Sequence, residues 1–144
     1  MIGNIFNIAG SALHAQMSRM NLAASNLANI DSVSTTEEGA YKAKRIVFKT
    51  IVEGMEVKNK FNENNQSAGG VKIESLVIDK KPVRKQYEPN NPIADKDGFV
   101  YQSNVSEIGE MVDMMAAARS YQNNIETVNT AKQLMMRAID VLRS

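Results

Sequence analysis

The sequence contains no cysteine and no tryptophan, and its single histidine is His14. The absence of cysteine excludes disulfide bonds, thiol catalysis and zinc sites built from cysteine or mixed Cys/His sets. Aromatic residues make up 6% of the 144 residues and hydrophobic residues 43%, so most apolar side chains are small or flexible. The 17 basic and 16 acidic residues nearly cancel, so no net field attracts a nucleic acid or an anionic membrane.

Long hydrophobic runs are also missing. The longest, Met114 to Ala118, is about a quarter of the roughly 20 residues that a membrane-spanning helix needs. The N-terminus has no basic cluster ahead of an apolar stretch, so we expect no cleaved signal peptide. The sequence therefore predicts a protein that does not span a membrane and that would be exported by another route.

Residues 1–31 predict a long helix with one apolar stripe. Small and apolar residues recur at spacings of three and four, the heptad pattern that turns one side of a helix towards a partner. The stripe consists of Phe6, Gly10, Leu13, Met17, Met20, Ala24 and Leu27. Arg19 is the only charged residue among the first 30, whereas a helix facing solvent normally carries charges on its outer side. We therefore expect this helix to be surrounded by protein.

Residues 105–144 predict a second, longer helix. Asn104 and Glu107 form a capping-box-like start, and a helix from about residue 105 to 143 would be roughly 55–60 Å long. The same spacing continues along it, with Lys132 as the one misfit. The stripe consists of Met111, Met114, Ala118, Tyr121, Ile125, Val128, Met135, Ile139 and Leu142. A helix of this length needs a partner along its whole extent, and adaptable methionines suit such a surface.

Residues 32–104 predict strands and loops. Segments rich in β-branched residues occur at 41–52, 71–78, 83–87 and 99–101. Polar segments with turn residues, 59–70 and 88–98, separate them. The predicted fold class is therefore mainly α: the terminal helices, 1–31 and 105–144, pair as a coiled coil, with a small β-rich or extended insert, 32–104, between them.

Candidate chemical sites have simpler explanations. Asp95 and Asp97 resemble part of a calcium loop, but Phe99 and Val100 occupy positions where an EF-hand needs a ligand and a glycine, so we expect a turn. His14 lies in an alanine-rich helix and is expected to be a packing or surface residue. We find no nucleotide-binding or nucleophile motif, and predict no cofactor or metal.

Acidic residues three apart open the second helix: Glu107, Glu110 and Asp113. A glycosidase would use two facing carboxyl groups, but acidic residues in a first turn also stabilise the helix dipole. We expect all three on a solvent-facing stripe.

The basic residues Lys80, Lys81, Arg84 and Lys85 are interpreted as a solvated hairpin face, with contact to an anionic partner surface as the alternative.

Neither terminal helix can bury its apolar stripe and pair its polar groups without neighbouring protein. Identical subunits that meet through non-identical faces form rings or helical filaments. The residues alone therefore indicate an assembling structural subunit.

Five segments resemble bacterial flagellar rod and hook proteins. SNLANIDSVST (25–35) and EMVDMMAAARSYQNNIETVNTAKQLMMRAI (110–139) are similar to the family's shared terminal segments. FNIAGSALHAQMSRMN, GAYKAKRIVF (39–48) and YEPNNPIADKDGFV (87–100) are similar to those of a proximal rod member. The resemblance covers the chain apart from residues 53–74.

The resemblance implies a non-enzymatic subunit of the flagellar basal-body proximal rod, which crosses the periplasm. Such subunits build a helical, hollow shaft that transmits torque around an export channel. The implied partners are copies of the chain, other rod proteins, the flagellar type III export apparatus and, as a further candidate, the surrounding ring proteins. Phe48 and Val52 fit the form of the family's export-gate segment.

The predicted assembly interface combines both stripes with the asparagine-rich signature. Its members are Phe6, Leu13, Met17, Met20, Ser25, Asn26, Leu27, Asn29, Met111, Met114, Ala118, Tyr121, Ile125, Val128, Met135, Ile139 and Leu142. Three alternatives stay open: a different axial subunit of the same family, a peptidoglycan-cleaving enzyme, and a cytoplasmic coiled-coil binding module or chaperone.

Overall fold

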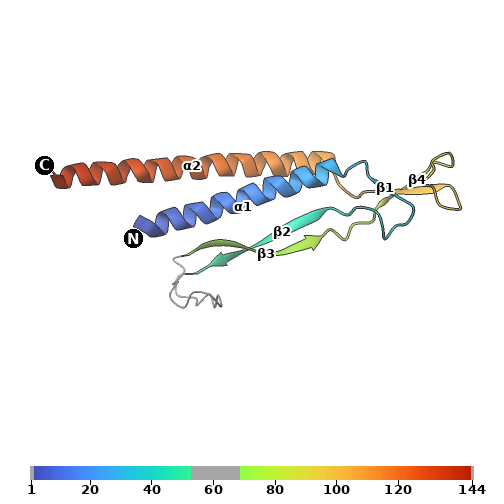
Figure 1. The fold of residues 1–144 in the computed structure, drawn as a ribbon, viewed down its shortest axis with the longest axis horizontal. Coiled ribbons are helices and arrows are strands. Elements are labelled where there is room, and N and C mark those ends of the chain that lie inside the picture. Colours follow the sequence, from blue (N-terminus) through green and yellow to red (C-terminus); the bar gives the residue numbers. More distant parts are fainter. Residues whose placement is uncertain (1, 53–68, 144) are drawn as a thin grey trace. The chain divides into compact units, whose positions relative to one another are not determined.

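The structure is a computed structural model that describes residues 2–52 and 69–143. Two helices, α1 (Ile2–Ala28) and α2 (Glu107–Arg143), begin and end the described chain (Figure 1). Between them lie five strands: β1 (Val33–Ser34), β2 (Lys44–Ile51), β3 (Gly70–Ile78), β4 (Arg84–Tyr87) and β5 (Phe99–Gln102).

The strands form two sheets. β5 is the central strand of a three-stranded antiparallel sheet in the order β1–β5–β4, while β2 pairs with β3 in a separate two-stranded sheet. Tyr101 of β5 lies opposite Ser34 of β1 on one side and Lys85 of β4 on the other. The basic segment before and within β4 is therefore not part of a hairpin with β3, because those strands belong to different sheets.

The predicted fold class is wrong. The described chain is an α+β protein with two antiparallel sheets, not a mainly-α coiled coil with a small insert. Hydrogen bonds tie α1 to the β2–β3 sheet: the Val71 amide donates to Ser11 Oγ at 3.1 Å, and the Lys44 amide donates to Asn26 Oδ1 at 3.1 Å. Helix periodicity could not reveal this, because it reports one apolar stripe and not which element covers the other sides.

Most strand positions were predicted correctly. β2, β3, β4 and β5 lie within one residue of, or inside, the four β-branched segments identified from the sequence. β1 was not predicted, because two residues are too few for an alternating pattern. The predicted loop at 59–70 lies outside the described residues except for Gly69 and Gly70.

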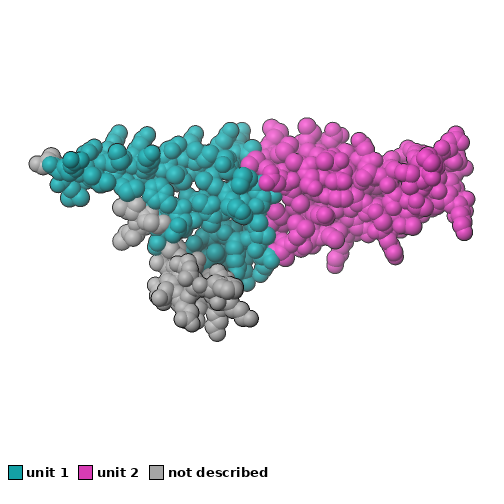
Figure 2. All heavy atoms as spheres, viewed as in Figure 1, with its two compact units in different colours: residues 1–18, 48–74, 117–144 teal, residues 19–47, 75–116 magenta. Residues whose placement is uncertain are grey.

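The chain divides into two compact units (Figure 2). Unit 1 comprises residues 1–18, 48–74 and 117–144, and unit 2 comprises residues 19–47 and 75–116. Each helix contributes one part of its length to each unit, so neither unit is a continuous segment of sequence. The division of the chain into terminal helices and a 32–104 insert stays a prediction.

Small residues dominate the buried positions of both units. Unit 1 buries Ala9, Ala15 and Ala117. In unit 1, a Cβ on Gly70, whose φ is +129°, would lie 2.7 Å from Ser11 Oγ, so this position requires glycine. The buried side chains of unit 2 are Ala23, Asn26, Ala40, Ala43, Val100, Ser103, Val105 and Glu110.

The start of α2 differs from the predicted cap. Ser106 occupies the N-cap position: its hydroxyl accepts a hydrogen bond from the Gly109 amide at 3.3 Å, and its carbonyl accepts one from the Glu110 amide at 2.9 Å. Asn104 instead joins other segments, since its Oδ1 accepts from the Ala43 amide and its Nδ2 donates to the Lys81 carbonyl.

Candidate functional site

A cluster of polar side chains lies in unit 2, where α1, residues 41–45 and the first turns of α2 meet. We call it the polar cluster. Buried polar groups are costly unless they find hydrogen-bond partners, so the partners show which segments the cluster holds together. Its members are Arg19, Asn26, Tyr41, Arg45, Glu110 and Asp113.

Asn26 is the centre of the polar cluster and is 1% exposed. Its Nδ2 donates to the Lys44 carbonyl at 3.0 Å and to Glu110 Oε2 at 3.1 Å. Its Oδ1 accepts from the Tyr41 hydroxyl at 2.9 Å and from the Lys44 amide at 3.1 Å. All four hydrogen bonds that an asparagine amide can make are formed. Asn26 therefore joins α1, β2 and α2 at one point.

Charged side chains extend the polar cluster beyond Asn26. Asp113 accepts a hydrogen bond from Arg19 and one from Arg45, both at 2.8 Å. Arg45 Nη2 also lies 3.1 Å from Glu110 Oε1. Glu110 Oε1 forms no hydrogen bond with a described residue, so its attraction to Arg45 is electrostatic. Two carboxylates and two guanidinium groups balance, which leaves the cluster neutral.

The acidic residues of α2 are not placed as the sequence predicted. Glu107 is exposed, but Glu110 is 1% exposed and Asp113 is half-buried between two arginines. The expectation of one solvent-facing stripe is therefore wrong for Glu110. The physical reason is that Asn26 and Arg45, which are distant in sequence, supply its partners. The contacts of Glu110 and Asp113 with Asn26 and Arg45 therefore join α2 to α1 and β2.

The predicted turn around Asp95 is confirmed. Asp95 Oδ1 accepts hydrogen bonds from the amides of Phe99 at 2.8 Å and Asp97 at 2.9 Å, and Gly98 adopts a φ of +81°. The Phe99 hydrogen bond is the main cause that holds the pKa of the Asp95 carboxyl below its ordinary value, and nearby Lys85 adds to the effect. Within residues 2–52 and 69–143, no group of three or more His, Asp or Glu side chains could hold a metal ion.

The predicted interface residues of α1 lie at different depths. Phe6, Leu13, Met20, Leu27 and Asn29 are partly buried, Met17 and Ser25 are exposed, and Asn26 is buried. The buried apolar positions of this helix are instead Ala9, Ala15 and Ala23. Alanines let neighbouring backbones approach closely, and none of these three belongs to the predicted stripe.

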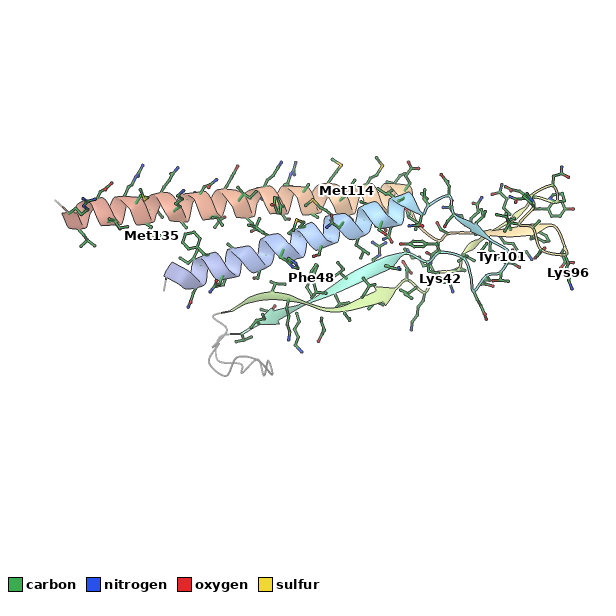
Figure 3. The ribbon with its side chains drawn as sticks, in the orientation of Figure 1. Lys42, Phe48, Lys96, Tyr101, Met114 and Met135 are labelled. Atoms are coloured by element: carbon green, nitrogen blue, oxygen red, sulfur yellow. The ribbon has the colours of Figure 1, made fainter. Side chains whose placement is uncertain are left out.

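The predicted stripe on α2 is close to the observed one but is rotated. Buried or partly buried residues at heptad spacing are Glu110, Met114, Ala117, Tyr121, Asn124, Val128, Ala131 and Met135, and Ala118 of the predicted stripe is also partly buried. Met114, Tyr121, Val128 and Met135 belong to both stripes, and Figure 3 labels Met114 and Met135 on the helix. The misfit at Lys132 is thereby explained, because Ala131 occupies the inward position and Lys132 is exposed.

Large apolar residues lie exposed on α2. Ile108, Met111, Val112 and Met115 follow the i, i+3, i+4, i+7 spacing of one helix face and are 77, 48, 59 and 71% exposed. Further along the helix, Ile125, Ile139 and Leu142 of the predicted interface are 38, 46 and 86% exposed. Exposed apolar faces of this kind mark surfaces that other proteins cover.

Phe48 of the predicted export segment lies within β2, and Val52 follows the last residue of the strand. Phe48 is partly buried on the strand, and Val52, just after it, is 56% exposed (Figure 3). None of the described helices is long and apolar enough to cross a membrane.

Sequence reasoning did not identify the polar cluster except for Asn26. Tyr41 and Arg45 lie in the GAYKAKRIVF segment, and the sequence predicts Glu110 and Asp113 as exposed acids that stabilise the helix dipole. One signal was present: Arg19 is the only charge in the first 30 residues, and the structure pairs it with Asp113. A buried asparagine that forms all four of its hydrogen bonds, together with exposed apolar helix faces, is typical of a structural subunit that is completed by its neighbours.

Comparison with known proteins agrees with that class. Residues 6–34 match the family "Flagella basal body rod protein", and residues 96–141 match "Flagellar basal body rod FlgEFG protein C-terminal". The chain is 46% identical to the flagellar basal-body rod protein FlgC of Salmonella typhimurium over 94% of both chains. It is 44% identical to FlgC of Escherichia coli O157:H7, over 94% of both, and to FlgC of Buchnera aphidicola from Acyrthosiphon pisum, over 96% of both. The chain belongs to the FlgC family of flagellar basal-body rod proteins.

Proposed function

We propose that the chain is a structural subunit of the proximal rod of the flagellar basal body. In this proposal it assembles with copies of itself and with other rod proteins into a helical, hollow shaft that transmits torque and surrounds the export channel. The observation that carries the proposal is the 46% identity to a FlgC protein across almost the whole of both chains. The exposed apolar face of α2 supports it, because an assembling subunit must present such surfaces.

The mechanism in this proposal is mechanical. The polar cluster holds α1, β2 and α2 in one register within unit 2, so this part of the subunit transmits force without rearranging. The exposed members of the predicted interface, from Met111 to Leu142 on α2, are covered by neighbouring subunits. Twisting the shaft would have to break many such contacts together, which makes it stiff.

The same proposal excludes catalysis. A peptidoglycan-cleaving enzyme needs two facing carboxyl groups with room for substrate, whereas Glu110 and Asp113 are committed to arginines and Asn26.

The partners of the chain in this proposal are macromolecular: other rod proteins, the type III export apparatus and the surrounding ring proteins. In this proposal, Phe48 and Val52 belong to the segment that the export gate recognises.

Deletion and recovery test the proposal. Deleting the gene in the bacterium that carries it should abolish swimming, and a plasmid copy should restore it. Purified basal bodies from the restored strain should contain the chain. A motile deletion strain, or basal bodies that lack the chain, would overturn the proposal. Incubating the purified chain with cell-wall material, with lysozyme as the positive control, tests the enzymatic alternative.

A further inference from the structure

The three-stranded sheet of unit 2 has edges of opposite charge. At one edge, Arg84 and Lys85 of β4 are exposed, and exposed Lys80 and Lys81 precede them. We call these four residues the basic edge. At the other edge, β1 is flanked by exposed acidic residues, and these form the acidic edge: Asp31, Glu37 and Glu38. The central strand β5 separates the two edges.

Neither edge forms an ion pair within the described chain. Its ion pairs join Arg19 and Arg45 to Asp113, Arg45 to Glu110, and Lys49 to Glu74, and none of them includes a residue of either edge. Asp79 adjoins the basic edge, but its carboxylate accepts a hydrogen bond from the Lys81 backbone amide. Asp95 also lies near Lys85, but Lys80 and Lys81 form no ion pair with a described residue.

Two residues of the basic edge are held in place. Arg84 donates a hydrogen bond to the Val105 carbonyl at 3.0 Å, and the Lys85 ammonium lies 3.9 Å from the centre of the Phe99 ring. The edge is therefore partly ordered before any partner arrives, which lowers the entropy lost on binding.

The charges discriminate between possible contacts of two copies. Two basic edges repel each other, as do two acidic edges, so symmetric edge-to-edge pairing is disfavoured. A basic edge and an acidic edge attract. We propose that a second copy of this chain docks its acidic edge against the basic edge of the first. Such a contact joins non-identical faces and propagates into a ring or a helical filament. The inference rests on the proposed rod function and specifies which surfaces of like subunits meet.

Cysteine cross-linking tests the contact directly, because the chain has no cysteine of its own. Cells whose only copy carries both Glu38→Cys and Lys81→Cys should yield, on oxidation, a ladder of linked dimers, trimers and larger species. Glu38→Cys alone and Lys81→Cys alone should stay monomeric, since like edges do not meet. Linked dimers from either single variant, or no ladder from the double variant, would overturn the inference.

Charge reversal supplies a second measurement. Replacing Glu37 and Glu38 by lysine, or Lys80 and Lys81 by glutamate, should abolish swimming, and combining all four substitutions should restore it. Lys96→Glu, an exposed reversal in the turn before β5 (Figure 3), should leave swimming unchanged. Normal swimming by both pairwise variants would refute the docking surface. The rod function would stand in that case as long as the wild-type chain is found in basal bodies; its absence there would refute the function itself.

Discussion

Asn26 of α1 pairs with the backbone of Lys44, the first residue of β2, through two hydrogen bonds of 3.0 and 3.1 Å. The side-chain amide of Asn26 thus offers the backbone of Lys44 one donor and one acceptor, as the backbone of a neighbouring strand would. Because the same amide also reaches Glu110 of α2, the pairing fixes the registry of three elements.

Asn26→Ala should lower the free energy of unfolding by about 3 kcal/mol, because it leaves the partly buried amide and carbonyl of Lys44 without their Asn26 partners. Urea unfolding followed by circular dichroism measures the change. Asn21→Ala is the matched control, since Asn21 is an exposed asparagine on the same helix. Equal stabilities for the two variants would show that the Asn26 bonds are not needed.

The pair formed by Arg45 and Glu110 should be energetically coupled. In a double-mutant cycle with Arg45→Met and Glu110→Gln, we expect a coupling of about 1–2 kcal/mol, since Glu110 is buried. The exposed pair Lys49 and Glu74, 3.2 Å apart, is the control, with an expected coupling of about 0.2–1 kcal/mol. A larger coupling for the control pair would contradict the assignment of the polar cluster as the structural centre.

The turn at Asp95 should make stability depend on pH. The folded pKa of Asp95 lies below its ordinary value of 3.8, chiefly because the Phe99 amide donates a hydrogen bond to the carboxylate. The ionised group therefore stabilises the folded state above pH 3.8, and this contribution is lost as the pH falls through the folded pKa. Asp95→Asn should be less stable than wild type at neutral pH, with the difference vanishing in acid. Urea midpoints measured from pH 7 downwards test this, and a difference that persists in strong acid would rule out the charge as the cause.

Ile125→Asp should block assembly and leave the subunit folded, because Ile125 is 38% exposed in the single chain. The variant should show the wild-type circular dichroism spectrum, whereas cells carrying it should not swim. Asn129→Asp introduces the same charge at an exposed polar position of the same helix and should swim normally. Swimming by the Ile125 variant would remove this residue from the predicted interface.

Several features were accessible from the sequence because they depend on residues close together in the chain. The 3–4 spacing located both helices, and β-branched segments located four strands. Asn26 was identified through the SNLANIDSVST segment. The fold class was wrong because strand location does not indicate sheet pairing: β4 pairs with β5, and β2 and β3 form their own sheet. The predicted inward face of α2 was displaced because the apolar residues Met111 and Ile125 were preferred over their polar neighbours Glu110 and Asn124.

The sequence by itself determined where the helices and strands form and which family the chain resembles, since these follow from local propensity, periodicity and motif order. The tertiary structure alone decided that Glu110 is buried and that Arg19 and Arg45 share Asp113. The reason is physical: a buried carboxylate is tolerated only where its partners converge, and Asn26 and Glu110 are separated by 84 positions in the chain. No pattern of neighbouring residues encodes a contact of that kind.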